Sequence, residues 1–200
     1  GASPQVLVLA HCDVQVLPRL RAGLRHLDLR GAQLSLPAAA EQTWQPLRHC
    51  AQLEVLSLAS NTELGARALR SCLESLPSQL KVLDLSDTQA DEAVLQAVFT
   101  QQSLTHLRMC RNPAMDNHLL ERVLLRLPNL EVLDVSGCRG LSLPFPSTAN
   151  SALRLLCVAH TALQPEPLRR ALLPVAPQAE VVPCLIDIFQ GYQQVPPVLV

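Results

Sequence analysis

Aromatic residues are scarce in this chain of 200 residues, which contains one tryptophan, one tyrosine and three phenylalanines. The formal net charge is only −1, and apolar runs extend to about five residues, as in Val6–Ala10. Nucleic-acid binding needs clustered basic side chains with stacking aromatics, and a membrane-spanning helix needs about 18 or more apolar residues in succession. We therefore expect no nucleic-acid partner and no membrane partner.

Motifs for catalysis are also absent. The sequence contains no G-x-S-x-G, no G-x-G-x-x-G, no P-loop, no H-E-x-x-H and no C-x-x-C. We expect no enzymatic activity, no catalytic residue and no cofactor.

Seven cysteines are scattered through the chain, an odd number that does not suit a secreted disulfide scaffold. Residues Gly1–Ala10 lack the basic start and longer apolar run of a secretory leader, and there is no Asn-x-Ser/Thr sequon. We expect reduced thiols and an intracellular location, in the cytoplasm or the nucleus. Because repeat-like sequence begins by residue 4, leaving no room for an N-terminal cap, we also expect the chain to be part of a longer one.

Leucine, in contrast, fills 41 positions, and one pattern, Leu-x-x-Leu-x-Leu-x-x-(Asn/Cys/Thr), recurs seven times. Six copies start at Leu24, Leu53, Leu80, Leu104, Leu130 and Leu153, and a degenerate copy runs from Pro4 to Cys12. Successive starts lie 29, 27, 24, 26 and 23 residues apart, which is the period of a leucine-rich unit and too short for ankyrin-type helical repeats. Each unit should contribute one short parallel strand with its second and third leucines facing inward.

The last position of the pattern forms a polar column. It reads Cys12, Ala32, Asn61, Thr88, Asn112, Cys138 and Thr161. All except Ala32 can form hydrogen bonds, and we expect them to satisfy backbone groups where the chain leaves each strand.

The segments between pattern copies are predicted to return mainly as helices. Apolar residues with a period of 3.6 predict helices over Glu63–Leu76, Asp91–Phe99 and Asp116–Leu127. Asp91 is a candidate N-cap, and a helix opening at Pro37 should end or kink at Pro46. The segment after Cys138 is too rich in proline for a helix. We expect a single domain over residues 1–200, with about seven repeats at 4–173, a cap or degenerate repeat at 174–190 and an extended tail at 191–200.

These repeats resemble the intracellular leucine-rich repeat proteins, and the resemblance covers residues 4 to 173. Unit length and helices are most similar to the ribonuclease-inhibitor-like and cysteine-containing subclasses, although the 23- and 24-residue units and the proline-rich stretch depart from both. The resemblance implies an α/β fold: a right-handed, curved solenoid, or horseshoe. Short parallel strands would line its concave face, and helices and irregular segments its convex face. It also implies that the concave sheet binds another macromolecule, usually a protein.

In that register the outward-facing strand residues form columns across the sheet. The central column reads Val8, Asp28, Ser57, Asp84, Arg108, Asp134 and Cys157. The predicted partner-binding residues are Asp28, Arg30, Ser57, Asp84, Asp87, His106, Arg108, Arg111 and Asp134. Asp84, Arg108 and Asp134 should lie side by side, either as a surface salt bridge satisfied within the protein or as a site for a basic segment of a protein or peptide.

An apolar column beside it allows two interpretations as well. It contains Val6, Val55, Val82, Val132 and Leu155. Aligned exposed apolar residues can mark an interface, but β-branched residues also simply suit strands.

A zinc site is the one metal centre that the sequence suggests, and spacing argues against it. Cys157 and His160, with His106 and Cys110 two strands earlier, have suitable ligand chemistry. Two strand spacings separate the pairs by about 10 Å, whereas zinc ligands lie about 2.0–2.3 Å from the ion. We expect no metal site.

The leading functional hypothesis is a non-enzymatic protein-interaction module, or scaffold, that binds a protein or peptide on its concave sheet. One alternative is the substrate-recognition domain of a larger enzyme complex such as a ubiquitin ligase, a role that some leucine-rich repeat proteins have. Another is a structural spacer.

Overall fold

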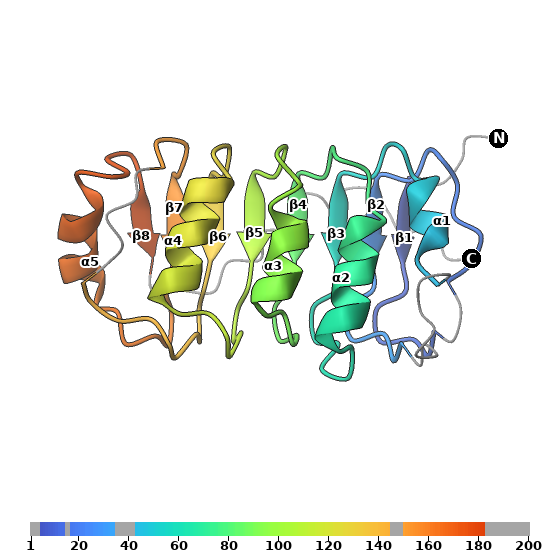
Figure 1. Cartoon of the computed structure of the whole chain (residues 1–200), viewed down its shortest axis with the longest axis horizontal. Coiled ribbons are helices and arrows are strands. Elements are labelled where there is room, and N and C mark those ends of the chain that lie inside the picture. The colour runs from blue at the N-terminus through green and yellow to red at the C-terminus, as the bar shows by residue number, and fades with distance from the viewer. Residues whose placement is uncertain (1–4, 15–16, 35–42, 145–149, 183–200) are drawn as a thin grey trace.

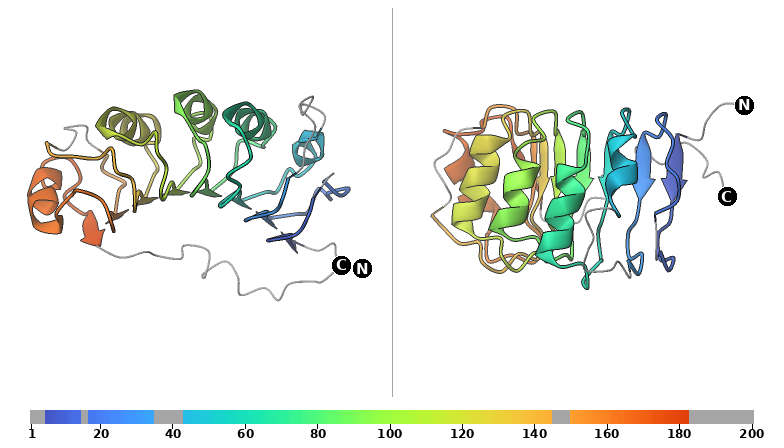
Figure 2. Two further views of the ribbon diagram at one scale, coloured as in Figure 1. Left: turned by 90° about the horizontal axis from the view of Figure 1, so that it is seen from below. Right: turned by 45° about the vertical axis from the view of Figure 1, so that its right-hand side comes forward.

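A computed structural model describes residues 5–14, 17–34, 43–144 and 150–182. Its centre is one sheet of eight parallel strands in sequential order. The strands are β1 (Val6–Val8), β2 (His26–Asp28), β3 (Val55–Ser57), β4 (Val82–Asp84), β5 (His106–Arg108), β6 (Val132–Asp134), β7 (Leu155–Cys157) and β8 (Glu180–Val182). Strands line the inner side of a curved molecule, and helices lie along its outer side (Figures 1 and 2). The predicted α/β horseshoe is confirmed.

Register follows the leucine pattern residue for residue. The second pattern leucines pair across the sheet in the order Leu7, Leu27, Leu56, Leu83, Leu107, Leu133 and Leu156, and Val181 of β8 continues the row. From Leu27 to Val181 every member of this row is fully buried. A one-residue slip would turn the whole row toward solvent, so the leucines fix the register.

The polar column bonds to the backbone as predicted. The Asn61 amide donates to the carbonyls of Leu29, Leu58 and Ala59, and the Thr88 hydroxyl donates to Leu85 O. Asn112 Nδ2 donates to Ala90 O, and the Cys138 thiol donates to Met109 O. Because several acceptors belong to the preceding repeat, the column links neighbouring coils.

Five helices are described on the outer side. They are α1 (Gln45–Arg48), α2 (Ala66–Glu74), α3 (Glu92–Val98), α4 (Asn117–Arg126) and α5 (Pro165–Leu172). The three predicted helices are confirmed with shorter ends, and Asp91 caps α3 by accepting a hydrogen bond from Val94 N. Asp116 caps α4 in the same way through Leu119 N. None of the described helices is long and apolar enough to cross a membrane.

Pro46 was expected to end or kink a helix, but it lies in the first turn of α1, where a missing backbone N–H costs nothing. That prediction was wrong, and the proposed opening at Pro37 lies outside the described residues. Strand β8 falls within the expected cap at 174–190, whereas residues 183–190 and the tail at 191–200 are not among the described residues.

Candidate functional site

The predicted binding residues occupy the inner side of the sheet. Strand pairing places Asp28, Ser57, Asp84, Arg108 and Asp134 next to one another in one row. His106 opens β5, and Arg30, Asp87 and Arg111 lie in the turns after β2, β4 and β5. The four members of the row other than Arg108 are at most 3% exposed. The row is therefore a largely buried layer, and its neighbours are more accessible.

The three aspartates of the central column each accept a hydrogen bond from a backbone N–H of the following turn. Oδ1 of Asp28, Asp84 and Asp134 accepts the N–H of the residue two positions later. At Ser86 and Ser136 the hydroxyl oxygen then accepts a backbone N–H of the next repeat, from Cys110 and Ala159 respectively. An Asp-x-Ser sequence thus joins consecutive repeats, and one carboxylate oxygen of each aspartate is committed to the fold.

Arg108 lies between two of these carboxylates. Its Nη1 is 3.5 Å from Asp84 Oδ2 and its Nε is 3.4 Å from Asp134 Oδ2, and its side chain is 14% exposed. Burial raises the pKa of Asp84, against the opposing effect of Arg108. Burial acts to lower the pKa of Arg108, but the charges of Asp84 and Asp134 outweigh it, and the net shift is upward. The expected pairing is present, but the expected surface location is wrong.

Curvature and close strand spacing account for that burial. Strands about 4.8 Å apart bring side chains of one column into contact, and inward curvature narrows the space above them. The same applies to the apolar column: Val55 and Val82 are buried and form a small cluster with Val132. These two valines are not the exposed apolar patch that their alignment suggested.

The turns that follow the strands carry the more accessible charges. Arg111 Nη2 lies 2.7 Å from Asp87 Oδ2, and Arg30 Nη2 lies 2.8 Å from Asp28 Oδ2. The hydrogen bond from Arg111 lowers the pKa of Asp87. On β5, His106 Nδ1 is 2.8 Å from Thr105 Oγ1, and burial lowers the pKa of the half-buried His106, against the charge of Glu131.

One backbone feature is shared by these turns. Positive φ occurs at the same position of seven repeats, at His11, Gly31, Ser60, Asp87, Arg111, Gly137 and His160. Five of the seven are not glycine, although this left-handed conformation costs other residues about 1–2 kcal/mol. The five non-glycine side chains at this position are therefore retained at a cost to the stability of the backbone.

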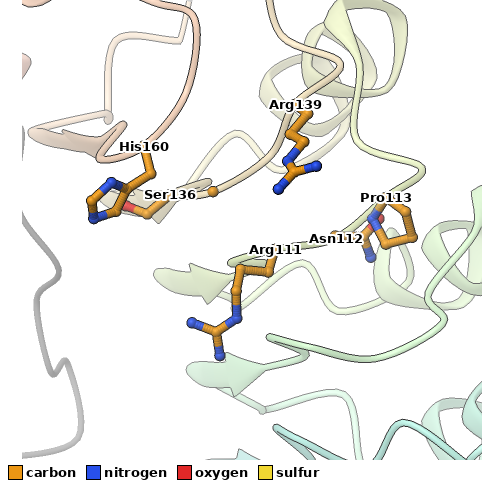
Figure 3. Close-up of a pocket in the computed structure, with 7 residues that line it drawn as sticks. Arg111, Asn112, Pro113, Ser136, Arg139 and His160 are labelled. Carbon is orange, nitrogen blue, oxygen red and sulfur yellow. The ribbon is translucent and has the colours of Figure 1, made fainter.

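A hollow that the sequence did not reveal lies at the carboxyl ends of β5, β6 and β7 (Figure 3). We call it the turn pocket; its volume is about 510 Å³. It is lined by Arg111, Asn112, Pro113, Ser136, Gly137, Arg139 and His160. Among these, only Arg111 was a predicted binding residue. The available signal was the presence of basic or imidazole side chains just after three successive strands.

Two buried cysteines near the sheet have raised thiol pKa values. Burial raises the pKa of Cys110 to about 11 and that of Cys138 to about 12, so both thiols are protonated at neutral pH. Within the described parts of the chain, no three His, Cys, Asp or Glu side chains are grouped so as to hold a metal ion.

Comparisons with known proteins agree with the fold. No family model matches the chain, and no curated protein matches its sequence. The structure is similar to internalin C2 from Listeria monocytogenes, with a TM-score of 0.60 and 19% identity over 89% of this chain and 70% of that one. It is also similar to the leucine-rich repeat-containing protein LegL7 from Legionella pneumophila, with a TM-score of 0.53 and 17% identity over 82% of this chain and 58% of that one. The recurring leucines, the sequential parallel sheet and these two likenesses together show that the chain folds as a leucine-rich repeat solenoid.

Proposed function

We propose that this protein is a non-enzymatic interaction module that binds a protein or peptide on its concave sheet. The observation that carries the proposal is the continuous, inward-curved row of eight strands, which aligns Asp28, Ser57, Asp84, Arg108 and Asp134 in register over β2 to β6. An extended curved surface of this kind suits a macromolecule, because solenoids bury little of a small molecule but offer many contacts along their length.

The accessible and the buried side chains of the concave face have different roles in this proposal. Contacts with the partner come from the more accessible side chains of Arg30, Asp87, His106, Arg108 and Arg111. The buried layer of Asp28, Ser57, Asp84 and Asp134 holds them in place, since its carboxylates accept turn N–H groups and pair with arginine.

A basic segment is the partner chemistry that we propose. Asp134 Oδ2 is buried and lies 3.4 Å from Arg108 Nε. A lysine or arginine of the partner would approach Asp87, whose side chain is 34% exposed, under the attraction of the carboxylates in the buried layer.

The test begins with affinity capture by the whole chain, followed by titration of the purified captured protein. In the Asp84→Asn/Asp134→Asn double variant, asparagine keeps the Oδ1 acceptor and removes the charge. A Glu63→Gln/Glu74→Gln double variant removes two carboxylates near and on α2, on the outer side, and serves as the control. We expect binding to fall at least tenfold in the first variant and to stay unchanged in the control. Undiminished binding by the first variant refutes the role of the central column, and failure to capture any protein favours a spacer.

We also propose an intracellular location, cytoplasmic or nuclear, and a mixed ribonuclease-inhibitor-like and cysteine-containing repeat type. Six described cysteines are free thiols, which suits a reducing compartment. Helices in several return segments and Cys138 in the polar column support the repeat type.

A further inference from the structure

We propose that the turn pocket binds an oxyanion, a carboxylate or a phosphate, carried on a peptide segment. The pocket is built from turns and not from the buried layer of the sheet, so this proposal does not rest on the one above. Two of its residues, Arg139 and His160, are not among the contacts proposed for the concave face.

The charge of the lining is one-sided. Two arginines and a histidine contribute to the pocket, and among the described residues no acidic side chain lines it. Arg139 is exposed, and within the described residues it forms no ion pair. Arg111 pairs with Asp87 through Nη2, and a guanidinium has five N–H donors, so further donors remain for a ligand. An oxyanion is the ligand that such a lining stabilises.

The backbone at Gly137 leaves space for the Arg111 side chain. Gly137 has a φ of +75°, and a Cβ at that position would lie 2.7 Å from Arg111 Cγ. The absence of a side chain there makes room for the Arg111 stem at the edge of the pocket. Figure 3 shows the Arg139 guanidinium reaching into the space between Ser136 and Asn112, while the Arg111 guanidinium and the His160 ring turn toward one side of the view.

The remaining polar lining is already engaged within the protein. Asn112 Nδ2 donates to Ala90 O and its Oδ1 accepts from Ala114 N, while the buried Ser136 hydroxyl accepts from Ala159 N. These residues form a fixed floor. The side chains left to bind a ligand are therefore Arg111, Arg139 and His160.

Size and composition favour a peptide-borne group. A volume of about 510 Å³ falls in the range of binding sites for small organic ligands and exceeds what a single free phosphate fills. Among the seven named lining residues the imidazole of His160 is the one aromatic ring, and none is the Phe, Tyr or Trp that typically forms a stacking platform for a nucleotide base. An acidic or phosphorylated side chain with its flanking residues fits both observations.

The test uses fluorescence anisotropy with three fluorescein-labelled peptides of one length. The first has a central pair of glutamates, the second has phosphoserine at the same positions, and the third has glutamine. We expect the first or second to bind, the third not to bind, and affinity to fall as salt is raised. The stronger of the two binders identifies the source of the oxyanion, and inorganic phosphate is added as a competitor.

Variants localise the binding. Arg139→Gln and His160→Gln remove groups unique to the pocket, and Arg67→Gln removes an exposed charge on α2 as the control. We expect Arg139→Gln to weaken binding by about tenfold, since it removes a charge-assisted donor, and Arg67→Gln to have no effect. Circular dichroism checks that each variant is folded.

Several outcomes would overturn the proposal. They are an equal loss in Arg67→Gln, full affinity in the Arg139→Gln/His160→Gln double variant, binding of inorganic phosphate without either peptide, or no binding of either acidic peptide. The Asp84→Asn/Asp134→Asn variant changes no residue that lines the pocket, so failure here and failure of the concave-face proposal are distinguishable.

Discussion

Replacing Asn61 by alanine tests the idea that the polar column holds the repeats together. The Asn61 side chain is buried, and its amide lies 2.8 Å from Leu58 O, 2.9 Å from Leu29 O and 3.2 Å from Ala59 O. Two of these carbonyls have other donors: Leu29 O accepts from Ala32 N, and Ala59 O accepts from Gly31 N. The substitution therefore orphans the Leu58 carbonyl above all.

The expected loss in the free energy of unfolding follows from these three hydrogen bonds. An unsatisfied buried carbonyl costs about 1–3 kcal/mol, and the two weakened bonds add a smaller amount. We expect Asn61→Ala to lower the free energy of unfolding by roughly 2–3 kcal/mol. Asn129→Ala is the matched control, because the exposed Asn129 amide also donates to a carbonyl, Gln102 O, but water can replace it there. Its expected cost is about 0.5 kcal/mol or less.

Urea unfolding measures both variants with two probes. Trp44 is the only tryptophan and is fully buried, so its fluorescence reports the N-terminal repeats. Far-ultraviolet circular dichroism reports the whole array, and coincident transitions justify a two-state free energy. If Asn61→Ala loses no more stability than Asn129→Ala, the column does not join the repeats energetically.

Three further predictions concern the charged layer and the thiols. Arg108→Met should cost roughly 3–5 kcal/mol in urea unfolding because it leaves buried carboxylates without a cation, and changing both flanking aspartates to asparagine as well should recover most of the loss. Because the folded-state pKa of His106 lies below its ordinary 6.5, the unfolded chain takes up the proton first, and stability should decline as pH falls below about 6.5; His106→Gln should show a shallower decline in thermal melts between pH 7 and 5. In a Cys184→Ser background, which leaves the six described cysteines, a chromogenic disulfide reagent at neutral pH should label the exposed Cys12 quickly and the buried Cys110, whose pKa is about 11, only on unfolding; rapid labelling that persists when Cys12→Ser is added contradicts this.

Strand positions were predictable because one local rule repeats. Side chains in a strand alternate with a period of two, so each pair of inward leucines fixes its strand, as Leu27 and Leu29 do in one repeat and Leu56 and Leu58 in the next. Helices with a strong apolar stripe and an aspartate cap, such as α3 and α4, were predictable for the same reason. Where only proline marked the helix, as at Pro46, the pattern did not distinguish a first turn from an end.

The surface was harder to predict because it depends on relations between repeats. Burial of Asp84 and Val82 results from curvature and from neighbouring columns, which a single unit does not encode. The turn pocket needs Arg111, Arg139 and His160 from three successive turns, and its shape depends on the left-handed backbone at Arg111 and His160. No sequence period describes such a hollow.

The sequential sheet has a mechanical consequence. Every strand pairs only with its neighbours, through seven interfaces in a row. Small hinge rotations therefore accumulate along the array, and about 1° at each of seven interfaces changes the angle between the terminal strands by about 7°. We expect the radius of the curved sheet to adjust to a bound partner through these small rotations, with little change in the length of any single hydrogen bond between strands.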